Sequence, residues 1–434
     1  MELFVTLLVV ILGLLILFRC LGAWGVSGRR FPVLGLSQWK ETVELPTVEG
    51  PDPGLPLWQV FLGSLGFRVF LLAAGMVGVM LLSGENLTLE TCFQQLCQRW
   101  DGYHYTHLIE QGYDGYMENG QHLFLVFFPG YVWAVRLLKW VIPNTVVAGV
   151  TLSCLCYGGA CCYLYKLAED YYDPKTARDF LLYLSLFPFS FFSGMVMTEG
   201  LFLFCTAGAC WYARKGNWLL FGAFGIAAAL TRMTGVLVIV PALVELLTRE
   251  KPFAFPVRES LGRCWKRILL RLPLIVSPLL GTAGYLALNW VVDGNPFAFV
   301  AHQRHWYQGY QWISQVVDYI LHYFVTNVSR SFGWATWFPA LVLFVLFWVV
   351  LFVAALDLKN PPSLLVYAFG LFVATYSLSW LLSAGRYLSC CFPVFLFLAR
   401  FTRKKPGLRD GILAGEGIFL GIYYCAYLSG AQVM

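Results

Sequence analysis

Long apolar runs recur along the whole chain and leave little room for a water-soluble domain. Of the 434 residues, 59% belong to the hydrophobic set AVILMFWYC and only 12% are Asp, Glu, Lys or Arg. This charged share is about half of that in soluble proteins, so the chain cannot cover a water-facing surface. The composition therefore predicts an all-α polytopic membrane protein.

Membrane-spanning helices can be located because each needs about 20 apolar residues to cross the hydrocarbon core. The sequence predicts about twelve, of which the short ones around Gly216 and Thr231 are equally compatible with re-entrant segments. Residues 1–56 are expected to form an N-terminal membrane anchor with a cytoplasmic linker, and residues 57–434 the main transmembrane domain. The twelve predicted spans are residues 3–18, 57–82, 146–167, 180–197, 201–213, 219–230, 236–247, 268–292, 337–356, 364–382, 387–399 and 411–427.

Lysine and arginine gather in alternate connections, which predicts the orientation of the spans. The densest groups lie in 249–271 and 400–409. If the basic connections are cytoplasmic, the remaining ones share the opposite, outer side. The basic connections all fall on one side only if residues 125–142 do not cross the membrane. This predicts interfacial helices in the first large outer loop. The outer connections are then residues 83–145, 198–199, 232–235, 293–330 and 384–386.

Several classes of protein are disfavoured by the same sequence. A net charge of +6 without a continuous basic stripe argues against a nucleic-acid partner. No Walker sequence is present, which argues against an ATP-driven pump. Among thirteen cysteines, Cys92 and Cys97 lie in a polar stretch, but their spacing fits a zinc site poorly and whether they are bonded stays open.

Asp101 follows Trp100 at the start of a helix-like stretch in the first outer loop. Its carboxylate can simply cap that helix, or it can act as a general base facing a cavity at the membrane surface. With His104 and His107 it forms D-x2-H-x2-H, so a divalent cation is possible but not favoured, because both histidines can equally be polar tips at the interface. The sequence leaves these alternatives open.

Three further ionisable residues lie at outer turns between apolar spans. Glu199 has no basic neighbour in sequence, and an acidic side chain at such a depth usually has a partner or a task. Arg232 and Arg386 run against the positive-inside bias. They can pair structurally with the carboxylates, or they can bind phosphate, which a guanidinium fork contacts through two parallel hydrogen bonds.

Residues 99–104, 109–113 and 127–131 resemble, in this order, the first lumenal loop of the PIG-V type mannosyltransferases. That family has W-D-x-x-H/Y-F, then I-A-x-x-G-Y, then F-F-P-G. The later segments T198-E-G-L-F202, A228-A-L-T-R-M-T-G235 and S383-A-G-R-Y-L-S-C-C-F-P393 also resemble family segments in the right order. Gly200 departs from the pattern, which has Ala at this position.

The resemblance implies a GT-C glycosyltransferase architecture with its active site at the outer or lumenal face. It implies an inverting mannosyltransferase similar to GPI mannosyltransferase II. The donor would be a polyprenyl- or dolichyl-phosphate mannose, and the acceptor a glycolipid or lipid-linked glycan. By the same resemblance, Asp101 matches the expected catalytic base and Glu199 a second acidic position, while Arg232 and Arg386 match two family arginines.

The expected site therefore contains Asp101 and Glu199 as catalytic residues, with no cofactor implied. The candidate substrate-binding residues are His104, Tyr105, Arg232, Arg386, Tyr387, His302 and Trp306, the last two in an outer loop rich in aromatics and amides. The expected location is the plasma membrane in a prokaryote or the endoplasmic reticulum membrane in a eukaryote. The alternatives are a secondary transporter or lipid flippase, which predicts charges near span centres and related halves, and a non-catalytic scaffold.

Overall fold

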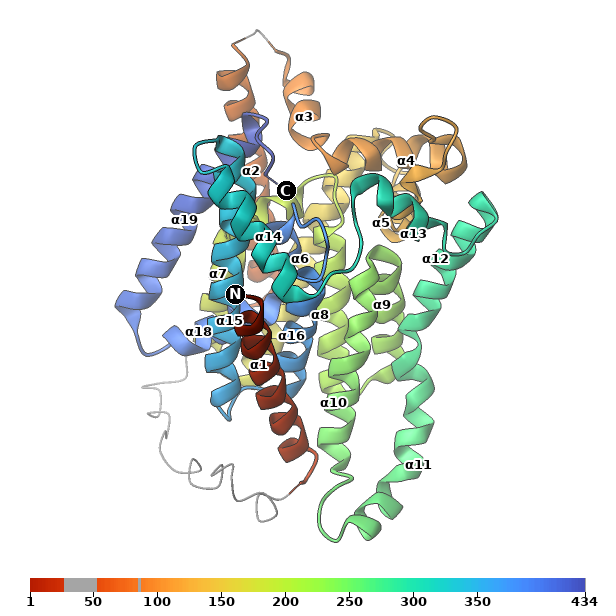
Figure 1. The fold of residues 1–434 in the computed structure, drawn as a ribbon, viewed down its shortest axis with the longest axis vertical. Helices are drawn as coiled ribbons and strands as arrows, with labels where there is room; N and C mark the ends of the chain where they lie inside the picture. Colours follow the sequence, from red (N-terminus) through yellow and green to blue (C-terminus); the bar gives the residue numbers. More distant parts are fainter. Residues whose placement is uncertain (27–52, 85–86, 434) are drawn as a thin grey trace.

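The computed structural model describes residues 1–26, 53–84 and 87–433, which form helices joined by mostly short connections (Figure 1). The predicted cytoplasmic linker lies largely outside the described residues. The α-helices are α1 (Glu2–Ala23), α2 (Leu57–Ser83), α3 (Leu89–Cys97), α4 (Asp101–Gly115), α5 (Pro129–Leu138), α6 (Thr145–Tyr171), α7 (Pro174–Leu186), α8 (Glu199–Lys215), α9 (Trp218–Thr231), α10 (Ile239–Glu250), α11 (Val257–Val276), α12 (Pro278–Asp293), α13 (Ala298–Gln303), α14 (Ile313–Thr326), α15 (Phe338–Leu356), α16 (Pro362–Thr375), α17 (Ala384–Leu388), α18 (Phe392–Thr402) and α19 (Pro406–Leu428).

Shorter helical turns separate several of these helices. Beyond two isolated β-bridges, the described residues contain no strand. The turns are η4 (Leu123–Val126), η5 (Ser190–Gly194), η6 (Met233–Val238) and η7 (Arg304–Trp306), which are 3₁₀ helices, and η8 (Gly333–Trp337), which is a π-helix.

Six helical segments of the described chain are long and apolar enough to cross a membrane, as an integral membrane protein requires. The count of twelve spans is not confirmed. The other six predicted segments are helical but short, from 11 residues in α18 to 17 in α8. At about 1.5 Å per residue these are shorter than a hydrocarbon core of about 30 Å. The six long segments are Glu2–Ala23, Leu57–Ser83, Thr145–Tyr171, Val257–Asp293, Gly333–Leu356 and Pro406–Leu428.

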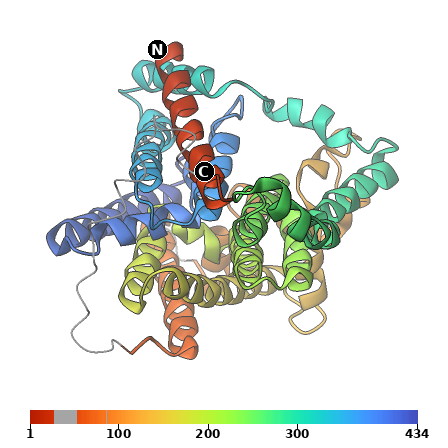
Figure 2. The ribbon, with the colours of Figure 1, turned by 90° about the horizontal axis from the view of Figure 1, so that it is seen from below.

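Most of the long helices run along the same axis, and several are seen close to end-on from below (Figure 2). Helices α3, α4 and α13 gather at one end of the molecule, while the connection from α10 to α11 lies at the other (Figure 1). The latter end carries ion pairs formed by the basic connections, such as Arg403 with Asp173 at 3.1 Å. The grouping of charges expected from the sequence therefore corresponds to two distinct ends of the helical bundle.

The first predicted outer loop is helical rather than extended, because it contains α3, α4 and α5. Helix α5 has only 10 residues, which is too few to cross a bilayer. This agrees with the prediction, from the alternation of charges, that residues 125–142 do not cross. Whether these helices lie on the membrane surface stays a prediction. Cys92 and Cys97 are both buried free thiols.

One predicted span, 180–197, is wrong as a continuous helix. Helix α7 ends at Leu186, and residues 187–198 continue through η5 and extended turns. The physical reason is Pro188, which disfavours helical geometry at the preceding residue; Phe187 accordingly has ψ 133°. Nearly all of this irregular segment is buried, which non-helical backbone at membrane depth requires.

A buried arginine satisfies the carbonyl groups that this break releases. Arg68, on α2, is only 1% exposed. It donates hydrogen bonds to the carbonyl oxygens of Ser190 at 2.5 Å and Ser185 at 3.1 Å. Its guanidinium also lies 4.3 Å from the ring centre of Tyr157 on α6. Because a helix C-terminus is electronegative, a cation there is favourable, so Arg68 connects α2, α6 and the broken segment.

We expect Arg68→Met to lower the free energy of unfolding by about 3 kcal/mol, because two buried carbonyl groups would lose charged donors. Unfolding temperature of the purified protein in lipid nanodiscs measures this. The matched control is Arg258→Met, at an exposed position of α11. Equal stability of the two variants would contradict this role of Arg68.

Candidate functional site

Four charged side chains, three in helices α4, α8 and α17 and one directly after α9, form one continuous chain of ion pairs. Arg386 Nη2 lies 2.6 Å from Asp101 Oδ2, and Arg386 Nε lies 2.8 Å from Glu199 Oε1. The same Glu199 oxygen also pairs with Arg232. The order is therefore Asp101–Arg386–Glu199–Arg232, with two positive and two negative charges. The four residues most strongly predicted from the sequence are brought together.

The chain of charges runs from a partly exposed end into the protein interior. The side chain of Asp101 is 26% exposed, whereas those of Arg386 and Glu199 are 6% and 0% exposed. A buried unpaired charge is very costly, so each buried member of the chain needs its partner of opposite charge. Asp101 is the carboxylate that an incoming molecule can reach.

Local backbone geometry explains how Asp101 is presented. The N-cap of α4 is Trp100, and no side chain caps this helix, so the interpretation of Asp101 as an N-cap is wrong. Trp100 has φ 53°, in the left-handed region that costs an L-residue about 1–3 kcal/mol. The unusual turn places Asp101 first in the helix, with its carboxylate directed to Arg386.

Glu199 is the central acceptor of the site. It is the first residue of α8, where the helix dipole stabilises a carboxylate. Its Oε2 atom is buried and has no hydrogen-bond partner among the described residues. The next residue, Gly200, packs so closely that a Cβ would overlap the Ser153 carbonyl oxygen. This contact explains why the chain has Gly where the PIG-V pattern has Ala.

Aromatic rings support both guanidinium groups. Tyr387 lies between them, with its ring centre 5.5 Å from the Arg386 guanidinium carbon and 5.6 Å from that of Arg232. Phe202 lies 5.3 Å from Arg232, and Phe192 lies 5.9 Å from Arg386. Such cation–π contacts hold the two arginines in place without neutralising them.

His104 and Tyr105 follow Asp101 on α4 but have different surroundings. Tyr105 is buried, with its ring centre 5.4 Å from that of Tyr131. His104 stacks on Phe124 at 4.8 Å, and its Nδ1 atom lies 3.0 Å from the Tyr116 hydroxyl. Burial lowers the pKa of His104 although Asp101 opposes this shift, so the neutral imidazole is favoured.

The second outer loop is only partly connected to this site. Trp306 lies edge-on to Phe124, with ring centres 6.1 Å apart, and so reaches the cluster around His104. His302 instead pairs with Asp293, 3.1 Å from Nε2 to Oδ2. Among the described residues it makes no hydrogen bond or ion pair with the four charged residues.

A metal-binding arrangement of Asp101, His104 and His107 does not form. His107 Nδ1 lies 2.9 Å from the carbonyl oxygen of Tyr103. Within the described ranges, no group of three His, Cys, Asp or Glu side chains is placed to hold a metal ion.

Two site residues were missed by reasoning from the sequence. Thr198 accepts a hydrogen bond from Arg232 Nε at 2.8 Å, and Cys390 Sγ lies 3.9 Å from Arg232 Nη1. Thr198 directly precedes Glu199 and could have been included on that ground. Cys390 carries no such signal, because its approach to Arg232 depends on how α17 packs.

The comparison with protein families gives one match within the chain. Residues 128–261 match the family described as dolichyl-phosphate-mannose-protein mannosyltransferase (PMT_2). This segment is less than one third of the chain; it contains Glu199 and Arg232 but not Asp101 or Arg386. No curated protein sequence matches the chain. The more specific likeness to PIG-V type enzymes stays a prediction.

Several solved structures share a general likeness with this chain. Against ArnT from Cupriavidus metallidurans, which is bound to undecaprenyl phosphate, the identity is 17% and the TM-score 0.46, covering 76% of this chain and 64% of that one. Against AglB from Archaeoglobus fulgidus, in complex with an inhibitory peptide and a dolichol-phosphate, the values are 13% and 0.46, covering 86% and 56%. This chain thus spans less than two thirds of either structure. Because both TM-scores are below 0.5, no residue role follows from the likeness.

We expect Glu199→Gln to reduce the free energy of unfolding by about 3 kcal/mol, since the buried Arg386 would keep only Asp101 and the largely buried Arg232 would lose its carboxylate. Thermal unfolding in nanodiscs tests this, with Glu110→Gln, at an exposed position of α4, as the matched control. A Glu199→Gln variant as stable as the control would show that the ion-pair chain is not needed for folding.

Proposed function

We propose that the protein is a membrane glycosyltransferase that uses a polyprenyl-phosphate-linked sugar, with mannose as the sugar. The observation that carries this proposal is the partly exposed Asp101 carboxylate held by Arg386, which Glu199 anchors from the buried side. The carboxylate can accept the proton of an acceptor hydroxyl, and the neighbouring guanidinium can bind the phosphate of the donor. The family match over residues 128–261 supports the same class of enzyme.

In the proposed reaction, Asp101 accepts the proton of an acceptor hydroxyl. The hydroxyl oxygen attacks the anomeric carbon of the donor sugar, and the bond from that carbon to the phosphate oxygen breaks. The polyprenyl phosphate leaves with the electron pair, and the anomeric configuration is inverted. One carboxylate is sufficient for this displacement, because the phosphate leaves as a stable anion.

The arginines give the leaving phosphate its positive partner. Arg386 has three nitrogens, and in the free protein two of them face carboxylates. A donor phosphate that binds Arg386 Nη2 in place of Asp101 would free the Asp101 carboxylate to accept the proton of the acceptor hydroxyl. Donor binding and activation of the base are then one event, which limits proton transfer in the absence of donor.

The aromatic cluster beside Asp101 is the proposed acceptor region. His104, Phe124, Tyr116 and Trp306 form a continuous set of ring contacts. Apolar ring faces with polar edges suit a sugar ring, so we propose a glycolipid or lipid-linked glycan as acceptor, as in PIG-V type enzymes. The donor would enter sideways from the bilayer, in the plasma membrane or the endoplasmic reticulum membrane.

The transporter alternative is less well supported by the position of the charges. A midplane transport site needs charged groups near span centres. Here Asp101 lies on α4, at the end of the molecule where α3 and α13 also lie (Figure 1), and Arg386 ties Glu199 to it, so the charges gather toward that end.

We expect Asp101→Asn to lower the rate of mannose transfer by at least about 100-fold, because the amide cannot accept the hydroxyl proton. The measurement is transfer from radiolabelled polyprenyl-phosphate mannose to candidate glycolipids by purified protein in nanodiscs. Asp114→Asn, at an exposed position of the same helix, is the control.

The unfolding temperature of Asp101→Asn should remain close to that of the native chain, because this carboxylate is partly exposed. A variant that folds normally and retains substantial transfer would remove Asp101 as the base. Absence of transfer by the native chain with every polyprenyl-phosphate sugar would overturn the function itself.

A further inference from the structure

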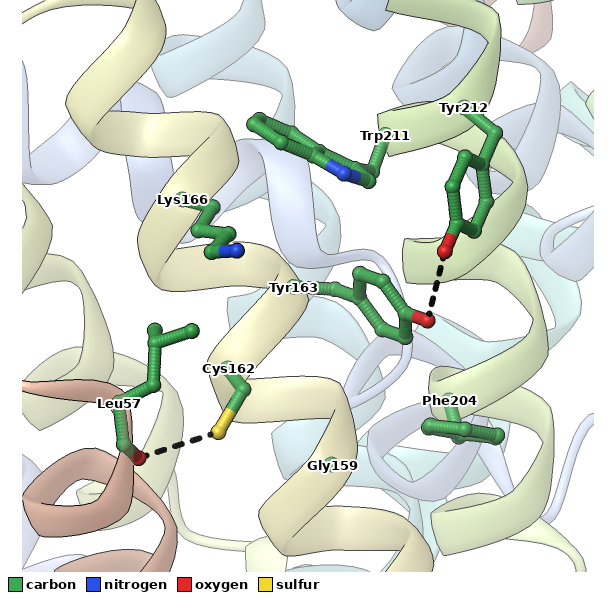
Figure 3. Close-up of a pocket in the computed structure, with 8 residues that line it drawn as sticks. All are labelled: Leu57, Gly159, Cys162, Tyr163, Lys166, Phe204, Trp211 and Tyr212. Carbon is green, nitrogen blue, oxygen red and sulfur yellow. Dashed lines mark hydrogen bonds between the residues drawn. The ribbon is translucent and has the colours of Figure 1, made fainter. Parts of the chain in front are cut away.

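A cavity lies far from the four-charge chain, toward the opposite end of helix α8. It has a volume of about 340 Å³ and opens between the start of α2 and the facing sides of α6 and α8 (Figure 3). Its lining residues are Leu57, Gly159, Cys162, Tyr163, Lys166, Phe204, Trp211 and Tyr212.

The lining changes from apolar to polar along the bundle axis. On α6, Gly159, Cys162, Tyr163 and Lys166 recur at helical spacing and share one face. Gly159 leaves room for the Phe204 ring, which a Cβ would approach to 2.8 Å. The Lys166 end lies about 10 Å further along the helix. One end of the cavity can therefore hold hydrocarbon, and the other a polar group.

Lys166 is the cationic group of this cavity, and its ammonium points into it (Figure 3). The side chain is half-buried and has no ion-pair partner among the described residues. Lys215 differs, since it pairs with Asp170, as does Arg214. The acidic neighbour Asp170 is thus already paired with two cations, which leaves Lys166 without a carboxylate partner in the described part of the chain.

Three aromatic residues surround the polar end. The Trp211 ring centre lies 5.8 Å from Lys166 Nζ. The Tyr163 and Tyr212 hydroxyl oxygens lie 3.3 Å apart (Figure 3), so one donates to the other and the second proton remains available to a further acceptor. An ammonium suits a phosphate oxygen, the hydroxyl pair suits a polar oxygen of the same head group, and tryptophan and tyrosine favour the depth of lipid head groups.

The position of the cavity indicates which leaflet it faces. Lys166 lies five residues before the end of α6, and Glu199 and Lys215 are opposite ends of α8. The cavity is therefore near the end that carries the basic connections, which the positive-inside rule places in the cytoplasm. Anionic phospholipids are concentrated in the cytoplasmic leaflet.

We propose that this cavity binds one anionic phospholipid of the cytoplasmic leaflet. Lys166 contacts the lipid phosphate, the Tyr163–Tyr212 pair contacts another oxygen of the lipid, and an acyl chain follows Gly159 and Phe204. This site is separate from the proposed donor site, because it lies at the other end of α8. It would take the lipid whether or not the protein transfers a sugar.

The test measures binding of phosphatidylglycerol to the purified full chain in neutral detergent by native mass spectrometry, with unfolding temperature as a second readout. We expect saturable binding of one lipid, and about fivefold weaker binding for Lys166→Gln, the loss expected for one lysine near a membrane surface. Lys166→Arg should retain binding because it keeps the charge. Lys266→Gln is the control, since Lys266 is exposed and lies beside Trp265 but lines no part of this cavity.

Two comparison ligands separate the possible sources of the phosphate. Phosphatidylcholine should bind more weakly than phosphatidylglycerol, and inorganic phosphate should not raise the unfolding temperature. Equal binding of phosphatidylglycerol by Lys166→Gln and Lys266→Gln would overturn the proposal. Equal stabilisation by inorganic phosphate would also overturn it, because the cavity would then take a free anion.

Discussion

A buried carboxylate shared by one buried and one largely buried arginine determines how the outer end of this protein is built. Glu199 cannot remain ionised in the interior without a cation, and neither guanidinium can remain there without an anion. These ion pairs bring together α8, the end of α9 and α17. The Nη2 atom of Arg386 then pairs with Asp101 on α4. The electrostatic condition for stability thus assembles the same groups that a phosphate-dependent transfer reaction needs.

The break in the chain after α7 allows α8 to begin at Glu199. A continuous helix through residues 187–198 would leave Glu199 inside a helix instead of at the start of one. Pro188 ends the helix early, and Arg68, on α2, donates hydrogen bonds to the carbonyl oxygens of Ser185 and Ser190. The chain can then turn inside the protein and begin α8 at Glu199. The irregular backbone is maintained by burial and by one well-placed cation, both of which membrane depth demands.

The two ends of α8 have different chemistry, although one helix connects them. Its first residue belongs to a cluster in which every cation is paired with a carboxylate. Its last turns face a cavity in which Lys166 has no carboxylate partner among the described residues. A cation paired with a carboxylate stabilises the fold and can bind a ligand only by losing that partner. A cation without a carboxylate partner can bind an anionic ligand directly. This difference separates a site for a reacting substrate from a site for a resident lipid.

Apolar runs, charge alternation and a few acidic and basic residues at outer turns were sufficient to predict a helical membrane protein and the residues Asp101, Glu199, Arg232 and Arg386. These signals are local, because hydrophobic length and charge can be read along the chain. Pairing partners, the break at Pro188 and the isolation of His302 could not be read in this way. They depend on which helix faces which, and tertiary packing alone decided that Arg386 would connect two carboxylates nearly 100 residues apart in sequence.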